Sequence, residues 1–189
     1  MLRLRRPRAT LIVGIIIATS AAAWSAERII AVPSRNRPQV YRLEDLPPLG
    51  GAAASQSPDR ATAKIREYGR VHEDTYAGSF VSGPYIFVGF TSEASTNFAA
   101  LQARLGSSVP VKVFQAQFTL ATLARTVDRI SQDIASWRKR GIEISAVWVD
   151  EYRNRVQVAL ANVSDDTMVV LKSTYGDMLA FSEGTFRAV

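Results

Sequence analysis

The sequence predicts an α+β fold made of two ββαβ units joined by a long helix. The first observation behind this prediction is an internal repeat, because residues 85–106 and 155–176 share one order of elements at a constant offset of 70. In each copy an alternating strand is followed by a polar turn and an amphipathic helix that stops at glycine. Only three of the 22 aligned positions are identical, so the repeat is visible in the spacing of residue types. The second observation is a helical pattern over residues 120–140, between the copies.

The first unit begins with two β-prone runs, residues 76–81 and 85–90, which a Ser-Gly-Pro turn separates. This punctuation favours a hairpin. Thr91 or Ser92 is expected to accept backbone N–H groups at the start of the following helix. Residues 111–118 then supply the third strand.

The second unit repeats this order. Residues 144–149 and 155–160 form the predicted hairpin, and Asn154 in its turn tolerates a left-handed backbone conformation. Ser164 is expected to cap the helix, and residues 178–182 form the closing strand.

The helix between the units is predicted to begin after Thr119, its cap, and to end at Gly141. A helix of this length spans about 30 Å, so we expect it to lie along both units and to join their cores. Its apolar positions continue for only about two and a half heptads, so a homodimeric coiled coil is possible but not required. These positions are Leu120, Leu123, Val127, Ile130, Ile134 and Trp137.

The N-terminal segment has the layout of a secretory signal. Four arginines precede the uncharged run of residues 9–26, and small residues allow cleavage after Ala23. The same 18 residues are just long enough to remain as a membrane anchor, which is the alternative expectation. Residues 27–74 are rich in Pro, Ala, Ser and Arg and are predicted to be a flexible spacer. The folded domain is expected over residues 75–184, followed by a short tail, 185–189.

The charge of the chain does not favour a nucleic-acid partner. Four of its 23 basic residues lie in the export signal, which leaves 19 basic against 17 acidic residues in the rest of the chain. That remainder shows no arginine stripe with interleaved aromatic residues of the kind that binds nucleic acid. A contact with the membrane is expected only through residues 9–26, if these are not cleaved. The basic run at residues 138–140 is interpreted as a solvated helix end, with anionic lipid or wall polymer as its minor alternative.

The residue types that carry most enzyme chemistry are scarce. His72 is the one histidine and there is no cysteine, so zinc and redox metals lack their usual ligands. The neighbouring acids Asp150 and Glu151 belong to a turn, where they cannot oppose each other across a cleft. We therefore expect no catalytic residue, no metal and no cofactor.

Several strands carry apolar residues on both faces. Phe87 and Phe114 in the first unit, and Val147 and Val149 in the second, lie on the face that the helix of their own unit cannot cover. Burial against the long helix or the other unit is one explanation. The other is a docking surface for a protein.

The order of elements and the segment at residues 147–158 resemble the pro-region of secreted chymotrypsin-like bacterial proteases of the alpha-lytic protease and streptogrisin type. The segment is similar to the V-D-x-x-x-N-R-V hairpin of those pro-regions, and the resemblance covers residues 77–184. It implies a foldase and inhibitor whose sheet packs on the protease and whose C-terminal tail enters the active-site groove. In this chain residues 182–189 occupy the tail position, and the candidate partner-binding residues in it are Ser182, Glu183, Thr185 and Phe186.

The chain ends at Val189, where such a pro-region would continue into its protease domain, so the assisted enzyme is expected to be a separate protein. Together these observations predict an exported, non-catalytic binding domain with a protein partner, of which a secreted serine protease is the candidate that the resemblance names. The alternative is a membrane-tethered extracytoplasmic sensor or cell-envelope component.

Overall fold

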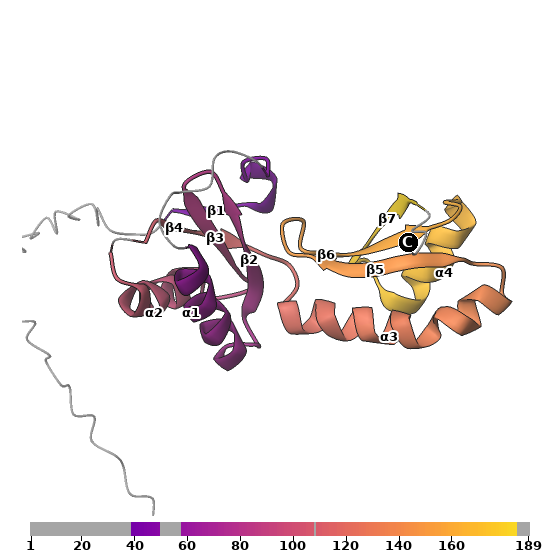
Figure 1. Cartoon of the computed structure of the whole chain (residues 1–189), viewed down its shortest axis with the longest axis horizontal. Coiled ribbons are helices and arrows are strands. Elements are labelled where there is room, and N and C mark those ends of the chain that lie inside the picture. The colour runs from indigo at the N-terminus through magenta and orange to yellow at the C-terminus, as the bar shows by residue number, and fades with distance from the viewer. Residues whose placement is uncertain (1–38, 50–57, 108, 185–189) are drawn as a thin grey trace, which may run out of the picture. The chain divides into compact units, whose positions relative to one another are not determined.

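The computed structural model describes residues 39–49, 58–107 and 109–184, and these residues form an α+β fold with two mixed sheets (Figure 1). The α+β prediction is therefore confirmed. The two ββαβ units are present in outline only, because the first half carries additional elements before its hairpin.

The first half contains a four-stranded sheet with the order β1-β4-β3-β2, in which only β2 and β3 are antiparallel. Its elements are β1 (Val40–Tyr41), the 3-10 helix η1 (Leu43–Asp45), α1 (Pro58–Val71), β2 (Tyr76–Ser82), β3 (Tyr85–Phe90), α2 (Ala94–Leu105) and β4 (Val111–Gln115).

The second half contains a three-stranded sheet with the order β5-β6-β7, in which β5 and β6 are antiparallel and β6 and β7 parallel. Its elements are α3 (Leu120–Lys139), β5 (Ile144–Asp150), β6 (Arg155–Leu160), α4 (Asp165–Tyr175) and β7 (Leu179–Glu183).

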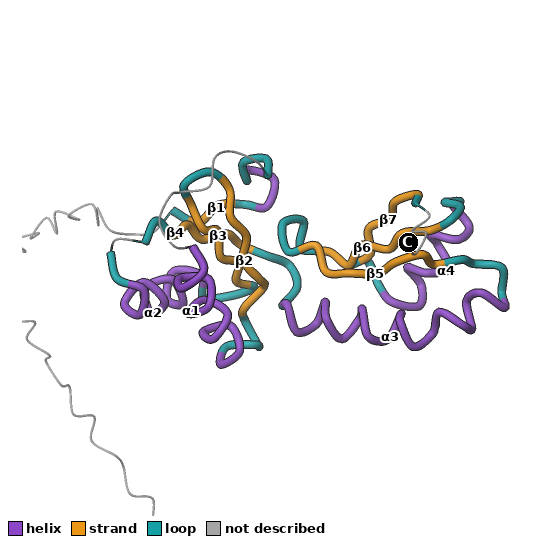
Figure 2. Tube along the Cα trace, viewed as in Figure 1, coloured by secondary structure: helices purple, strands orange, loops and turns teal. Residues whose placement is uncertain are grey.

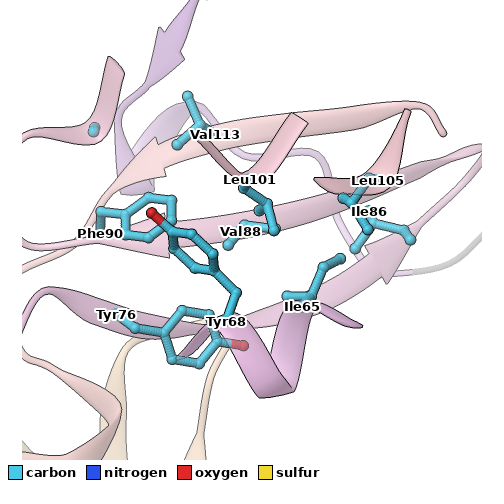
Figure 3. Close-up of a cluster of buried hydrophobic side chains, with 10 residues drawn as sticks. Ile65, Tyr68, Tyr76, Ile86, Val88, Phe90, Leu101, Leu105 and Val113 are labelled. Atoms are coloured by element: carbon cyan, nitrogen blue, oxygen red, sulfur yellow. The ribbon is translucent and has the colours of Figure 1, made fainter. Parts of the chain in front are cut away.

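Helix α1 overturns part of the predicted spacer. Ile65 and Tyr68 of α1 are fully buried in the main core of the first half, together with residues of α2 and of the sheet (Figure 3). The Tyr68 hydroxyl donates to Asn97 Oδ1 on α2 at 2.9 Å, and Figure 2 shows α1 and α2 next to each other. This stretch contains few apolar residues because α1 buries only one narrow apolar stripe. Residues of the sheet and of α2 complete the core around that stripe.

The last turn of α1 lies close to the first residue of β2. A Cβ atom at Gly69 would overlap the ring of Tyr76, the first residue of β2, so the approach requires glycine. Residues 39–49, also assigned to the spacer by composition, contribute β1 and the buried Leu46. The remaining spacer residues, 27–38 and 50–57, lie outside the described residues.

The predicted caps are confirmed at two helices and wrong at one. Thr119 Oγ1 accepts the Thr122 N–H at 3.1 Å, and Ser164 Oγ accepts the Thr167 N–H at 3.3 Å. Neither Thr91 nor Ser92 caps α2. The chain enters α2 through Glu93 in a left-handed conformation (φ 50°), and no side chain caps its first turn.

Helix α3 belongs mainly to the second half and lies alongside β5 (Figure 1). Its buried residues Leu123, Ile130 and Trp137 join the core of that half, while Leu120 at its start packs against the core of the first. The expectation that this helix joins both cores therefore holds at its first turn only. At the other end, the Trp137 indole donates to the Tyr175 hydroxyl at 2.6 Å and so holds α3 against α4.

Replacing Ile65 with alanine tests whether α1 is part of the core. A fully buried isoleucine leaves a cavity on truncation, so I65A should lower the free energy of unfolding by about 2–5 kcal/mol. The matched control is V71A in the same helix, because Val71 is 56% exposed and its truncation should change stability by less than about 0.5 kcal/mol. Urea denaturation followed by circular dichroism measures both. Equal, small effects would place α1 outside the core.

Alkaline pH should weaken the fold through Tyr76. Burial raises the pKa of Tyr76 from its ordinary value of 10.0 to about 12, because the phenolate is poorly solvated there. Deprotonation of Tyr76 is therefore less favourable in the folded state than in the unfolded state. The contribution of neutral Tyr76 to the free energy of unfolding is fully present below pH 10 and is lost as the pH rises through about 12. From pH 10 to pH 12, the free energy of unfolding should fall for both chains. The fall should be about 2 kcal/mol smaller for Y76F than for the chain that keeps Tyr76. Parallel curves in urea titrations at each pH would contradict this assignment.

Candidate partner-binding surface

The two phenylalanines predicted for a docking surface on the first sheet are buried. Phe87 is 1% exposed and Phe114 is fully buried, so neither can meet a partner. They lie on the face of the sheet opposite α1 and α2, in a second core with Leu46, Ala77 and Ala116. Of the two explanations for an apolar second face, burial is correct here.

Side chains from both halves of the folded unit cover this second core. Tyr41 packs edge-on against Phe87 with 5.9 Å between ring centroids, and it belongs to the segment that composition had assigned to the spacer. From the second half, Tyr152 packs edge-on against Phe80 at 5.1 Å, and Phe80 in turn stacks on Phe87 at 5.2 Å. Of the two covers that we had considered, the other unit contributes through Tyr152, whereas no residue of the long helix belongs to the cluster.

Asn154 anchors the hairpin that carries Tyr152. Its side chain is fully buried, and Oδ1 accepts the backbone N–H groups of Gln117 and Phe118 at 2.9 and 2.8 Å. Nδ2 donates to the Phe118 carbonyl at 2.8 Å. The backbone of Asn154 is left-handed (φ 53°), as predicted, so the residue supplies both the turn and the anchor.

Glu151 makes a second contact between the hairpin and the first sheet. Its Oε2 accepts the Ser79 N–H at 2.6 Å, a donor on the edge strand β2. A Cβ atom at Gly78 would lie 2.5 Å from this same oxygen, and Gly78 has a φ of 114°, so glycine is required here for space and for conformation. The carboxylate therefore covers an edge donor that could otherwise pair with another strand.

On the second sheet, Val147 and Val149 point the opposite way from the prediction. Both pack against the core formed with α3 and α4. The reason is a bulge in β5 between Ile144 and Ala146, which inserts one residue and reverses the alternation that follows. Trp148 consequently lies on the outer face and is 40% exposed.

On this outer face Trp148 lies between a row of small residues and the charged pair Asp150 and Arg155. The strand register places Trp148 beside Gln157 and Gln157 beside Ala180. The next row consists of Ala146, Ala159 and Ser182. Gln157 and Ala159 on the central strand are buried, at 7% and 1% exposure, while Ala146, Ala180 and Ser182 are half-buried. Trp148 is therefore the large exposed side chain of this outer face, which we define by Trp148, Gln157, Ala180 and Ser182.

The predicted tail residues divide between described and undescribed positions. Ser182 lies on the outer face, half-buried, and Glu183 is the exposed last residue of β7. Thr185 and Phe186 lie outside the described residues.

His72 stacks on the Tyr68 ring at 4.1 Å, and within the described part of the chain no group of three or more His, Asp or Glu side chains could hold a metal ion. Two open clefts are present. One of about 240 Å³ lies between α1 and the start of α3, and one of about 390 Å³ is lined by Leu43, Glu44 and residues of the hairpin.

No helix among the described residues has both the length and the apolar character needed to cross a bilayer. The apolar run at residues 9–26 lies outside these residues. In comparisons with known proteins, neither the family models nor the curated proteins match this chain.

Replacing Asn154 should separate its two roles. N154A removes three hydrogen bonds and leaves buried N–H groups without an acceptor, and it also forces alanine into a left-handed conformation, so we expect a loss of about 3–5 kcal/mol. N154G removes the same bonds but keeps the backbone relaxed, and should be about 1 kcal/mol less damaging. The control is R153A, at the exposed neighbour. Chemical denaturation gives the three values, and equal effects of N154A and R153A would remove the anchor role.

Proposed function

We propose that this chain is an exported, non-catalytic binding domain that contacts a partner protein through the outer face of the second sheet. The observation that carries the proposal is Trp148, a large aromatic side chain that remains 40% exposed on the outer sheet face. Tryptophan dominates the binding energy of many protein interfaces, and exposed apolar area on an open sheet suits a protein partner.

The partner class follows from the resemblance to protease pro-regions. We propose a secreted chymotrypsin-like serine protease, which this domain assists in folding and inhibits in trans. The second-sheet face, with β7 leading into the tail, is the surface that supports this proposal. The hairpin at residues 150–154 carries the resemblance, but in this chain it is occupied by contacts with the first sheet.

The alternative proposal is a membrane-tethered component of the cell envelope, held by residues 9–26. Mass spectrometry of the native N-terminus separates the two, because a chain that starts near Trp24 or Glu27 carries no tether.

A refolding experiment tests the protease proposal. A denatured alpha-lytic-type protease is refolded with and without an equimolar amount of this chain, and the recovered activity is measured after the domain is removed. We expect a higher yield with the chain present, and inhibition of the mature protease before removal.

The variants W148A and V169A show where the contact lies. W148A should weaken binding by about 30-fold or more if the indole is central to the interface. V169A truncates an apolar side chain that is 66% exposed on α4, and should leave binding unchanged. A refolding yield that is the same with and without the chain would overturn the foldase and inhibitor role.

A further inference from the structure

The solvent face of α3 carries a row of cations. Arg125, Arg129 and Arg140 follow one another at helical spacing, with the uncharged Gln132 and Ser136 completing the row between them. All five residues are exposed and lie outside the buried stripe that packs on the second sheet, with Arg140 as the C-cap of the helix. The guanidinium groups of Arg129 and Arg140 turn toward Tyr175 and Trp137 at the edge of that core. At 1.5 Å per residue, the row extends over about 22 Å. We call these five residues the cationic row.

The helix carries more basic than acidic residues. Residues 120–140 contain five basic and two acidic residues, and within the described part of the chain none of the five basic groups forms an ion pair. Asp128 and Asp133 lie one helical turn from Arg125 and Arg129, and Asp133 accepts the Tyr175 hydroxyl at 2.7 Å, so an excess of three positive charges remains on the segment. The face therefore presents a positive potential to solvent.

Contacts with neighbouring side chains hold the guanidinium groups in place without removing their charge. Arg140 lies over the Trp137 ring at 4.1 Å and Arg129 over the Tyr175 ring at 5.5 Å. Arg125 Nη2 donates to Thr122 Oγ1 at 3.2 Å. Because each group is already ordered, binding an anion costs less side-chain entropy than it would for free arginines.

We propose that the cationic row docks the domain on a membrane surface rich in anionic lipid headgroups. Neither of the two clefts is lined by a residue of the row, so the row suits a flat, extended anionic surface better than a single inserted side chain. This proposal rests on the tethered alternative, in which residues 9–26 are retained as an anchor and the linker length keeps the folded unit within reach of the bilayer. Because β1 begins at Val40, only 13 residues separate the apolar run ending at Ala26 from the folded unit, a maximum of about 45 Å.

This docking extends the membrane contact beyond residues 9–26 and is independent of the partner proposed for Trp148. Each basic residue near an anionic surface strengthens binding by about fivefold, and salt weakens the effect. Three arginines therefore suffice for a large difference between anionic and neutral lipid.

Energy transfer to a labelled lipid measures the docking. The chain has no cysteine, so S136C introduces a single site for a donor dye in the middle of the row. The full chain is reconstituted into vesicles of neutral phosphatidylcholine, or of the same lipid with 30% phosphatidylglycerol, each with an acceptor-labelled lipid. We expect stronger transfer on the anionic vesicles at 50 mM salt, and the same weak transfer on both at 500 mM.

Two triple variants of equal charge provide the control. R125Q/R129Q/R140Q should reduce the preference for anionic vesicles by at least tenfold, whereas R42Q/R60Q/K172Q, at exposed positions elsewhere, should change it by less than twofold. Circular dichroism verifies that both fold. Equal transfer on the two vesicle types, or equal losses in the two variants, would overturn the proposal. Binding to soluble polyglutamate is measured as well. If R125Q/R129Q/R140Q loses this binding but keeps its preference for anionic vesicles, the membrane proposal is overturned in favour of an acidic protein segment as the ligand.

Discussion

The two halves of the folded unit depend on one buried amide. Asn154 stands at the start of β6, and its side chain binds the backbone at Gln117 and Phe118, between the last strand of the first sheet and the cap of α3. These bonds determine where α3 begins relative to the β5–β6 hairpin. Tyr152 can then cover Phe80, and Glu151 can reach Ser79, only because the turn is held in this place. The second core of the first sheet is thus completed by a hairpin that belongs to the other half.

Comparison of the two halves explains how a duplicated scaffold came to have this contact. Both hairpins carry a bulge at the start of their first strand, between Tyr76 and Gly78 and between Ile144 and Ala146. The loops differ. Two residues separate β2 from β3, whereas four separate β5 from β6, and the longer loop contains Glu151, Tyr152 and Asn154. The repeat therefore supplies the architecture, and the longer loop supplies the contact between its copies.

The parts that could be predicted from sequence are those with a local cause. The alternation in β3 and β6, the apolar stripe of α3 and the caps at Thr119 and Ser164 each depend on residues close in the chain. The missed parts depend on distant contacts. Residues 58–71 contain few apolar side chains, and Ile65 and Tyr68 find a core only when the sheet and α2 are present. Val147 and Val149 were assigned to the wrong face because a bulge, which alternation alone does not reveal, reverses the strand.

The layers of the second half place the two surfaces proposed for binding on opposite sides. Helices α3 and α4 cover the inner face of β5-β6-β7, so the solvent face of α3 and the sheet face around Trp148 point away from each other. The two surfaces also differ in chemistry, since one carries an excess of arginine and the other a tryptophan beside small residues. In the proposed docking through α3, Trp148 is directed away from the membrane. The β5–β6 hairpin contributes to this division, because its Tyr152 and Glu151 contact the first sheet.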